Sequence, residues 1–330
     1  MKKILVTGGA GYIGSHTLVE LSLHNFYPII VDNLCNTSIK NIKGVEKITG
    51  KSIPFYNVDC TNEKALNNVF EKEKNILGTI HFAAYKSVEE SVKYPHKYHS
   101  NNIGSLQVLL NVMKNHHVEN IIFSSSCTVY GNPDVLPICE NAPFKKAESP
   151  YGKTKQLCEE LLNKTDILGI SLRYFNPIGS HESGLIGDRS SDNPNNLVPI
   201  ITETAIGKRE IVTVFGDDYD TKDGTCLRDY IHVVDLANAH VKALQYVMKN
   251  KVKSAFNIGT GNGVSVLEAI HIFEKVNNIK VNYKIGPRRD GDVEQIYSDN
   301  TLSTNELEWE AKRTIEEAMS SAWLWEQQKQ

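Results

Sequence analysis

Short apolar runs alternate with amphipathic stretches along the first half of the chain. The runs are rich in Ile, Val and Phe, which is typical of buried parallel strands. We expect strands at Ile4–Thr7, Ile29–Asp32, Ile53–Asp59, Thr79–Phe82, Ile121–Ser124 and Ile170–Tyr174, and helices at Ser15–Leu23, Glu63–Lys74, His96–His116 and Tyr151–Leu162. This alternation predicts βαβ units and therefore an α/β fold with a doubly wound, Rossmann-type parallel sheet.

The pattern changes from about residue 176. Residues 177–196 are rich in Gly, Ser, Asn and Asp, and are too many for a simple connector. Beyond them we expect helices near 197–206, 235–249 and 266–275 and a strand near 211–215. The chain thus divides into a first unit over residues 1–176 and a smaller mixed α/β unit over 177–330, with segments near 229–260 interleaved into the first.

Composition narrows the class of protein. The 330 residues are 40% hydrophobic and 23% charged, with a net charge of −3 and no long basic run, which argues against a nucleic-acid partner. No apolar stretch reaches bilayer length, and the first apolar run ends after three residues, too few for a signal-peptide core. Six scattered cysteines without a Cys-x-x-Cys motif read as reduced thiols. We therefore expect no membrane association and a cytoplasmic location.

A glycine-rich turn follows the first predicted strand. Gly8, Gly11 and Gly14 lie between that strand and a helix, where they let the backbone approach a pyrophosphate that the helix N-terminus stabilises. Asp32 ends the second strand eighteen residues after Gly14, where an acid binds ribose hydroxyls. No arginine is near it in sequence, which favours NAD over NADP. Alternatively, the glycines form a plain glycine-rich turn, and Asp32 is an acid in a turn at the strand end.

Two more strand ends extend this interpretation. Asp59 ends the third strand, where it would face the adenine or, alternatively, cap a helix before Thr61. The run Phe82 to Ala84 ends the fourth strand with small residues that allow a ligand to come close. Open α/β sheets bind ligands at such carboxyl ends.

Tyr151 is the only one of fourteen tyrosines with a lysine four residues later, Lys155. On a helix this spacing sets both side chains on one face. At about 6 Å and an effective dielectric near ~20, the ammonium would stabilise a phenolate by roughly 3 kcal/mol, or about two pKa units, as a general base requires. The serine run Ser124–Ser126 ends the fifth strand, where the nicotinamide should reach. Alternatively, Tyr151 and Lys155 are a solvated pair on the surface, and the serine hydroxyls satisfy backbone groups in a turn.

Eight segments resemble the UDP-glucose 4-epimerase (UDP-galactose 4-epimerase) family of extended short-chain dehydrogenases/reductases. They are residues 6–16, 32–36, 123–126, 149–155, 172–177, 194–197, 228–233 and 288–292. The glycine motif is common to many dinucleotide-binding proteins, whereas the segments at 194–197, 228–233 and 288–292 are much more specific. The likeness runs from residue 4 to about 325, so it covers nearly the whole chain.

The resemblance implies an NAD-dependent isomerase. It would catalyse the reversible 4-epimerisation of UDP-galactose and UDP-glucose through a 4-keto intermediate with tightly bound NAD. Residues 1–176, with the interleaved segments near 229–260, would form the NAD-binding Rossmann domain, and 177–330 would mainly bind the UDP-sugar. The family's homodimer pairs the helices that correspond here to about 96–116 and 151–165 in a four-helix bundle.

The resemblance also implies residue roles. Tyr151 would be the catalytic base and acid, Lys155 its electrostatic partner and nicotinamide-ribose ligand, and Ser126 a hydroxyl between Tyr151 and the sugar. NAD would also be contacted by Gly8, Gly11, Tyr12, Ile13, Gly14, Asp32, Asn33, Asn36, Asp59, Cys60, Phe82, Ala83, Lys86, Asn101 and Phe175. Besides Ser126 and Tyr151, the nucleotide sugar would be held by Asn176, Asn196, Leu197, Phe215, Arg228, Arg289 and Asp292. Arginines suit a diphosphate, although either one alone reads as a solvated surface charge.

Two departures from the family pattern leave alternatives open. Family members restricted to glucose and galactose often have a bulky tyrosine before the equivalent of Tyr297, where this chain has Ile296, so UDP-GlcNAc and UDP-GalNAc are alternative substrates. The loop Ser180–Asp192 matches the family less well than its flanks do, so the resemblance does not define how this loop lies over the substrate.

Other functions are less well supported. An NDP-sugar dehydratase needs a carboxylate just after the serine run, where this chain has Cys127–Val129. A non-catalytic NAD-sensing protein would generally lack the tyrosine–lysine pair. His96 with His99, and His116 with His117, suggest metal ligands, but no carboxylate or cysteine frames them, and solvated helix positions are the simpler interpretation. We expect no metal.

Overall fold

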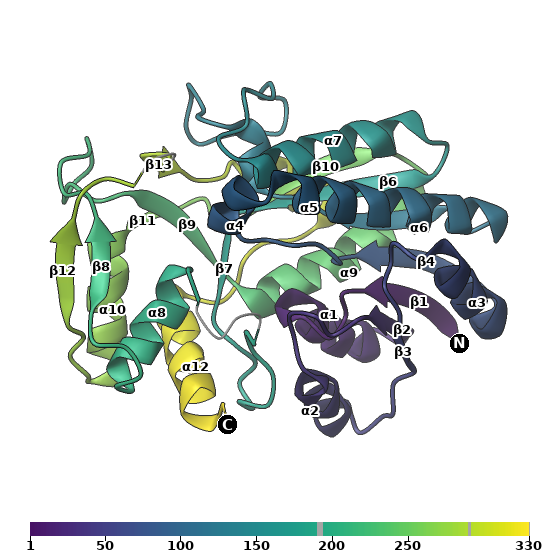
Figure 1. Ribbon diagram of the computed structural model, residues 1–330, viewed down its shortest axis with the longest axis horizontal. Coiled ribbons are helices and arrows are strands. Elements are labelled where there is room, and N and C mark those ends of the chain that lie inside the picture. Colours follow the sequence, from purple (N-terminus) through teal and green to yellow (C-terminus); the bar gives the residue numbers. More distant parts are fainter. Residues whose placement is uncertain (190–193, 290–291, 330) are drawn as a thin grey trace.

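The computed structural model describes residues 1–189, 194–289 and 292–329, and its largest element is a seven-stranded parallel sheet (Figure 1). The strands are β1 (Lys2–Thr7), β2 (Phe26–Asp32), β3 (Phe55–Asn57), β4 (Ile76–His81), β5 (Asn120–Ser124), β6 (Leu168–Tyr174) and β10 (Ser254–Ile258), in the order β10-β6-β5-β4-β1-β2-β3. All six predicted strands are confirmed, although β3 is shorter than expected. The strand order reverses between β1 and β4, which is where such sheets bind ligands.

Helices cover both faces of this sheet. One face carries α1 (Tyr12–Leu23), α2 (Ile39–Thr49), α9 (Val233–Asn250) and α11 (Thr301–Leu307), and the other carries α3 (Glu63–Glu73), α6 (Gly104–Asn115) and α7 (Pro150–Lys164). Because neighbouring strand residues point to opposite faces, Ile4 and Val6 of β1 join the first core cluster and Leu5 joins the second. The predicted doubly wound fold is therefore confirmed.

The helical segment predicted at 96–116 is interrupted. It consists of α5 (Pro95–Tyr98), a π-helical turn (His99–Ile103) and α6, so its hydrogen-bond register changes once. The helices without a predicted counterpart include α2, α11 and the short α4 (Val88–Lys93). The segments of α4 and α11 bury few apolar side chains and therefore give a weak pattern. Helix α2 is amphipathic, with Ile42 and Val45 buried, and its pattern was missed.

The remaining elements form a second, mixed group. They comprise the strands β7 (Asn176–Ile178), β8 (Val212–Phe215), β9 (Leu227–His232), β11 (Gly263–Ser265), β12 (Tyr283–Gly286) and β13 (Gln295–Ile296), and the helices α8 (Leu197–Ala205), α10 (Val266–Asn277) and α12 (Ile315–Gln328). The short 3-10 helix η2 (Cys127–Tyr130) instead packs against α7 and β6 of the first group. Their core includes Ile201, Val214, Phe273 and Met319. The predicted helices near 197–206, 235–249 and 266–275 and the strand near 211–215 are confirmed by α8, α9, α10 and β8.

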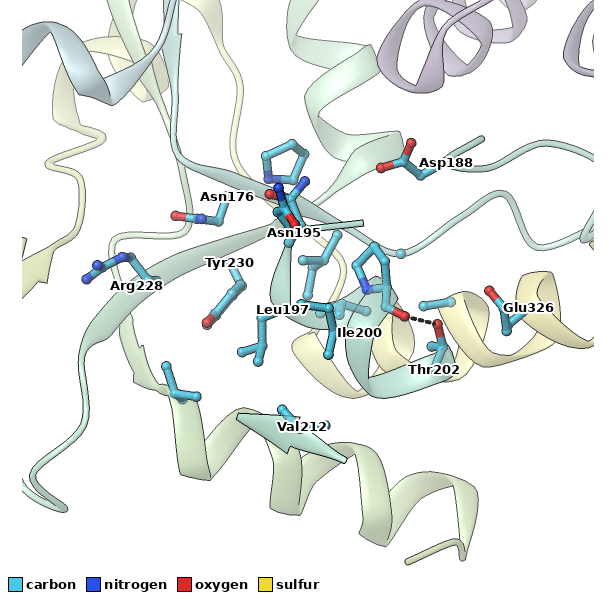
Figure 2. A pocket seen from close by; sticks show the side chains of 18 of the residues that line it. Asn176, Asp188, Asn195, Leu197, Ile200, Thr202, Val212, Arg228, Tyr230 and Glu326 are labelled. Atoms are coloured by element: carbon cyan, nitrogen blue, oxygen red, sulfur yellow. Dashed lines mark hydrogen bonds between the residues drawn. The ribbon is translucent and has the colours of Figure 1, made fainter. Parts of the chain in front are cut away.

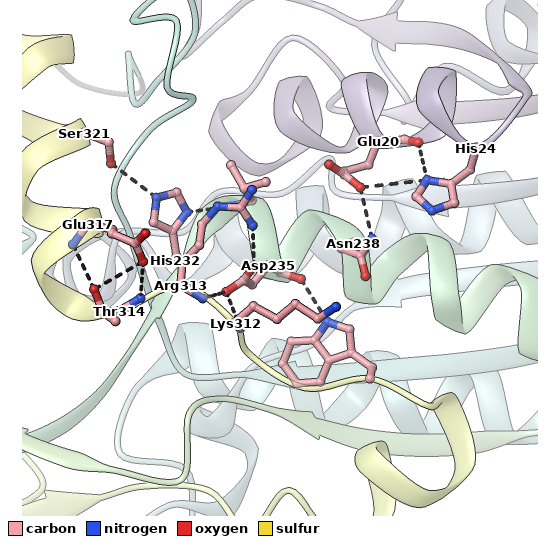
Figure 3. A network of polar contacts seen from close by, with 12 residues as sticks. Glu20, His24, His232, Asp235, Asn238, Lys312, Arg313, Thr314, Glu317 and Ser321 are labelled. Atoms are coloured by element: carbon pink, nitrogen blue, oxygen red, sulfur yellow. Dashed lines mark hydrogen bonds and ion pairs between the residues drawn. The ribbon is translucent and has the colours of Figure 1, made fainter.

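The chain crosses between the two groups more than once. After β9, helix α9 packs against α1 and β10 pairs with β6, so late residues complete the first sheet. The segment before α12 returns to α9, where the Asp235 carboxylate accepts hydrogen bonds from the Lys312 and Arg313 amides at 2.8 and 2.7 Å (Figure 3). Arg313 also donates from Nη1 to Asp235 at 2.6 Å. Within the described ranges, no helix is long and apolar enough to cross a membrane.

Four histidines are buried in this framework. Burial lowers the pKa of His16 and His81 to about 3, and that of His232 and His240 to about 4. An unfolded histidine titrates near ~6.5, so the unfolded chain takes up protons before the folded one does. Stability is therefore complete above about pH 6.5 and falls as the pH drops towards the folded-state values.

We expect the free energy of unfolding to decrease steeply between pH 6.5 and 5. Each such histidine contributes up to about 1.4 kcal/mol per pH unit in that window. Replacing one of them, His16→Gln, should reduce the slope by about that amount, whereas the exposed-site control His96→Gln should leave it unchanged. Urea denaturation at several pH values measures the slopes, and equal slopes for wild type and His16→Gln would contradict this assignment.

Candidate active site

Two pockets lie side by side where the parallel strands end. All eighteen residues predicted to contact the cofactor line the first, here called the strand-end pocket. The seven further residues predicted to hold the substrate line the second, here called the α8 pocket. Tyr12, Asn176, Pro177 and Asn196 line both pockets, so a ligand in one lies next to a ligand in the other.

The glycine turn leaves no space for side chains. Gly8 has φ +68°, and a Cβ there would lie 2.8 Å from the Ala83 nitrogen, while a Cβ on Gly14 would lie 2.4 Å from the Gly8 carbonyl oxygen. Gly11 is the N-cap of α1 and supplies no side-chain cap, so the first-turn N–H groups have no side-chain acceptor. These N–H groups fit the pyrophosphate of NAD.

The acids at the strand ends are held by backbone amides. Asp32 accepts hydrogen bonds from Ala10 N at 3.0 Å and Leu34 N at 2.9 Å, while burial raises its pKa. Asp59 accepts from Thr61 N at 2.8 Å, and the N-cap of α3 is Asn62, so the alternative role of Asp59 as a helix cap is wrong. Among the described residues that line the strand-end pocket, the cations are Lys86 and Lys155 and none is an arginine, which suits NAD rather than NADP.

Tyr151 and Lys155 lie one turn apart at the start of α7. Ser149 caps this helix by accepting from Gly152 N at 3.1 Å, and Pro150 occupies its first turn. The Lys155 ammonium is 5.7 Å from the centroid of the Tyr151 ring and donates to the Ser124 carbonyl at 2.6 Å. Local capping and the four-residue spacing thus bring the predicted pair into the strand-end pocket.

The expected acidification of Tyr151 by Lys155 is wrong for the pair on its own. Burial raises the pKa of Tyr151 above its ordinary value, and the Ser126 hydroxyl opposes this rise. Burial also lowers the pKa of Lys155 to about 8, because the residue is only 3% exposed. The desolvation of both groups outweighs their attraction, and the Lys155 ammonium points to a carbonyl rather than to the phenol oxygen.

The α8 pocket contains two arginines that share one carboxylate. Asp292 pairs with Arg289 at 2.7 Å and with Arg228 at 3.6 Å. Arg289 also lies 5.3 Å from the centroid of the Phe215 ring. Figure 2 shows Arg228 and Asn176 at one end of the pocket and Asp188 and Glu326 at the other. Two guanidinium groups beside an aromatic face suit a nucleoside diphosphate.

Several lining residues were not predicted. In the strand-end pocket they include Tyr174, Cys127 and Thr128; Tyr174 ends β6, so its place at a strand end was a usable signal. The α8 pocket also includes Tyr230 and Trp325. Trp325 comes from the last helix, and no local pattern connects that helix to the pocket.

The structure also bears on the less certain predictions. Asp188, from the loop Ser180–Asp192, lines the α8 pocket and pairs with Lys86 at 3.4 Å. Residues 190–192 of that loop lie outside the described residues. The same holds for Asp290 and Gly291 of the segment 288–292. Ile296 is buried in a cluster with Cys127 and Phe175, both of which line the strand-end pocket. Across the described ranges, no three His, Cys, Asp or Glu side chains gather in a way that would hold a metal ion.

Comparisons with known proteins agree with this geometry. The profile of the NAD dependent epimerase/dehydratase family matches residues 4–259. The UDP-glucose 4-epimerase of Dictyostelium discoideum is 48% identical over 98% of this chain and 95% of its own length, and that of Bacillus subtilis is 47% identical over 98% and 96%. The structure of UDP-glucose 4-epimerase from Bifidobacterium longum in complex with NAD+ and UDP has a TM-score of 0.94 at 44% identity, covering 99% of this chain and 98% of that one.

Another solved structure is still more similar in shape. The UDP-glucose 4-epimerase of Stenotrophomonas maltophila, with bound NAD and formylated UDP-arabinopyranose, has a TM-score of 0.97 at 42% identity. The alignment covers 100% of this chain and 99% of that one.

We expect Arg228→Gln to weaken the binding of UDP to the NAD-loaded protein by about 10- to 100-fold, because a charge-assisted hydrogen bond in a partly buried site is worth roughly 1.5–3 kcal/mol. The control is Arg209→Gln, which alters a guanidinium paired with Glu203 outside both pockets. Isothermal titration calorimetry measures both constants. A Kd for Arg228→Gln within twofold of wild type would exclude Arg228 from the nucleotide site.

Proposed function

This chain belongs to the NAD dependent epimerase/dehydratase family, and on that premise we propose which of its residues carry out the reaction. The reaction is the reversible 4-epimerisation of UDP-galactose and UDP-glucose, with NAD as the cofactor. The observation that carries the assignment is the junction of the two pockets, with Tyr151 and Ser126 in the wall of one and Asn176 and Asn196 shared by both.

The strand-end pocket holds NAD in this proposal. The first turn of α1 binds the pyrophosphate, Asp32 binds the adenosine ribose, and Lys155 binds the nicotinamide ribose. Asp32 and Lys155 are largely buried, so they are oriented before the cofactor arrives. NAD held by these residues would supply reversible hydride transfer at the sugar C4.

Tyr151 and Ser126 handle the proton at the sugar 4-oxygen. The phenol takes the proton from the 4-hydroxyl as the 4-keto sugar forms, and gives it back after the sugar has presented its other face. Tyr151 is half-buried in the wall of the strand-end pocket, so bound cofactor and sugar would cover its phenol and limit the exchange of its proton with bulk water. A fixed positive charge lowers the pKa of a phenol, so a cationic nicotinamide bound beside Tyr151 would supply the acidification that Lys155 alone does not.

The α8 pocket holds the nucleotide. Arg228 and Arg289 bind the diphosphate, and Phe215 provides a flat apolar surface for the base. Asp292 keeps both guanidinium groups in place through its pairs with them. Asn176 and Asn196 lie where the two pockets meet, and their amides donate to and accept from the sugar hydroxyls.

The division of labour follows the two groups of elements. We keep residues 1–176, with the returning segments near 229–260, as the NAD-binding domain, and 177–330 as mainly the UDP-sugar domain. The pairing of β10 with β6 supports the return of the chain. The strand β9, however, joins the second group, so only part of the 229–260 segment belongs to the first sheet.

Neither rival within the fold is favoured. The place just after the serine run holds Cys127, Thr128 and Val129, so the carboxylate that water elimination requires is absent from it. A protein that only senses NAD has no use for Tyr151 beside Lys155 in the cofactor pocket. N-acetylated substrates depend on the space near Ile296, but the relatives at 47–48% identity are named UDP-glucose 4-epimerases.

Replacement of the phenol tests the assignment directly. Tyr151→Phe should lower kcat on UDP-galactose by at least about 10²- to 10⁴-fold, the usual contribution of general acid–base catalysis. Bound NAD should be retained, because the glycine turn and Asp32 are untouched. A coupled assay for UDP-glucose and the absorbance of released cofactor measure the two quantities.

The matched control is Tyr94→Phe, which removes a phenol that is 59% exposed on a nearby segment. Its kcat should equal that of wild type. A Tyr151→Phe enzyme that retains more than a tenth of the wild-type kcat would remove the tyrosine from the mechanism.

We also propose a homodimer in which α6 and α7 pair with the same helices of a second copy. These helices carry the half-buried Val108, Leu157 and Leu161, of which Val108 and Leu161 also pack against the second core cluster. Six free cysteines are consistent with a cytoplasmic protein, where thiols stay reduced.

Light scattering should give twice the chain mass of 37.0 kDa. Leu157→Arg should halve the measured mass, because it places a charge at a contact that excludes water. Ile285→Arg, at an exposed apolar side chain of β12, should not. A wild-type mass of a single chain would exclude the dimer.

A further inference from the structure

The reacting centre joins two separate elements. Tyr151 lies at the start of α7, whereas Ser126 follows the end of β5 and caps η2. Proton transfer requires their hydroxyls to stay in a fixed relation, because small displacements of a reacting group cost large factors in rate. Something must therefore fix the end of β5 against α7.

We propose that Glu159 is a positioning residue of this centre: by accepting a hydrogen bond from Ser125, it holds the neighbouring Ser126 hydroxyl against the Tyr151 phenol. This inference rests on the function proposed above. Glu159 lies two helical turns beyond Tyr151 and one beyond Lys155, so all three side chains share one face of α7.

Two side chains of α7 hold consecutive residues of the β5 end. Lys155 donates to the Ser124 carbonyl at 2.6 Å, and the Ser125 hydroxyl donates to Glu159 Oε1. The Ser125 amide also donates to the Leu172 carbonyl of β6 at 2.9 Å. Ser125 is fully buried, and its hydroxyl and its amide are both hydrogen-bonded. Its backbone cannot rotate without losing these two hydrogen bonds.

Arg173 of β6 fixes Glu159 from the other side. Its Nε is 3.0 Å from Glu159 Oε1, and its Nη2 is 2.7 Å from Oε2, which is the fork geometry that favours a carboxylate. Arg173 Nη1 donates to the Tyr130 hydroxyl at 3.0 Å and to the Glu140 carbonyl at 2.9 Å. The guanidinium is thereby locked on three sides.

The burial of this pair argues for a role beyond stability. The side chains of Arg173 and Glu159 are only 9% and 3% exposed. Removing two charges from water costs as much as their attraction returns, so a well-packed apolar pair would serve the core equally well. The pair differs from an apolar one in the acceptor that it presents to Ser125, next to the catalytic hydroxyl.

Ser125→Ala removes this contact and leaves the ion pair intact. We expect kcat to fall about tenfold, with KM for UDP-galactose, bound NAD and Tm all close to wild type. Because the Ser126 hydroxyl opposes the rise in the pKa of Tyr151, its displacement should also move the acid limb of the kcat profile to higher pH. The matched control is Ser22→Ala, which removes a buried hydroxyl that bonds the Leu18 carbonyl in α1 and should change none of these quantities.

A double-mutant cycle tests the route through Glu159. In the background Glu159→Leu with Arg173→Leu, which leaves no unpaired charge, Ser125→Ala should have no further effect on kcat. If the effects of Ser125→Ala and of the leucine pair on kcat are additive, the proposal is overturned. For Ser125→Ala alone, a kcat within twofold of wild type or an unshifted acid limb would also overturn it. So would a loss of kcat that matches a loss of bound NAD. If the leucine pair does not fold, the kcat and the acid limb of Ser125→Ala decide. An inactive wild type would instead refute the proposed function.

Discussion

The contact between the Lys155 ammonium and the Ser124 carbonyl joins the helix that carries the phenol to the strand end that carries the serines. The contact is buried, so water does not compete with it. It places a cation beside Tyr151 and fixes α7 against β5. Lys155 therefore supplies both the positive charge near Tyr151 and the contact that fixes α7 against β5, so loss of this side chain would remove both.

The fold places this centre between two ligands. Parallel strands end at one edge of the sheet, and elements of the second group, among them α8, β8 and β9, form the pocket next to that edge. After β9 the chain returns to complete the sheet with β10. The strand-end pocket is built mainly by the strand ends, and the α8 pocket by α8, β9 and the segment that carries Arg289 and Asp292. In the proposed mechanism the sugar must turn over between two hydride transfers, so the nucleotide would be held firmly while a few amides at the junction would hold the sugar. Such an arrangement allows inversion without release.

Sequence reasoning reached the fold because the strong signals were local. The glycine turn after β1 and the spacing of Tyr151 and Lys155 specify their own geometry. It failed where the outcome depended on distant packing. The pKa of Tyr151 follows burial, which no local pattern states, and Trp325 reaches the α8 pocket through the packing of the last helix. Roles in the α8 pocket came from resemblance, because the pairing of two arginines with Asp292 brings together segments that are far apart in the chain.

The central claim is that hydrogen leaves and returns to the same carbon inside a closed site. It is tested most directly with UDP-galactose carrying deuterium at C4, incubated with the purified enzyme and an excess of free unlabelled NADH. The account predicts that the UDP-glucose formed retains the deuterium at C4 almost completely, because the cofactor stays bound and the site excludes water. Loss of the label to solvent or to the free cofactor would contradict it.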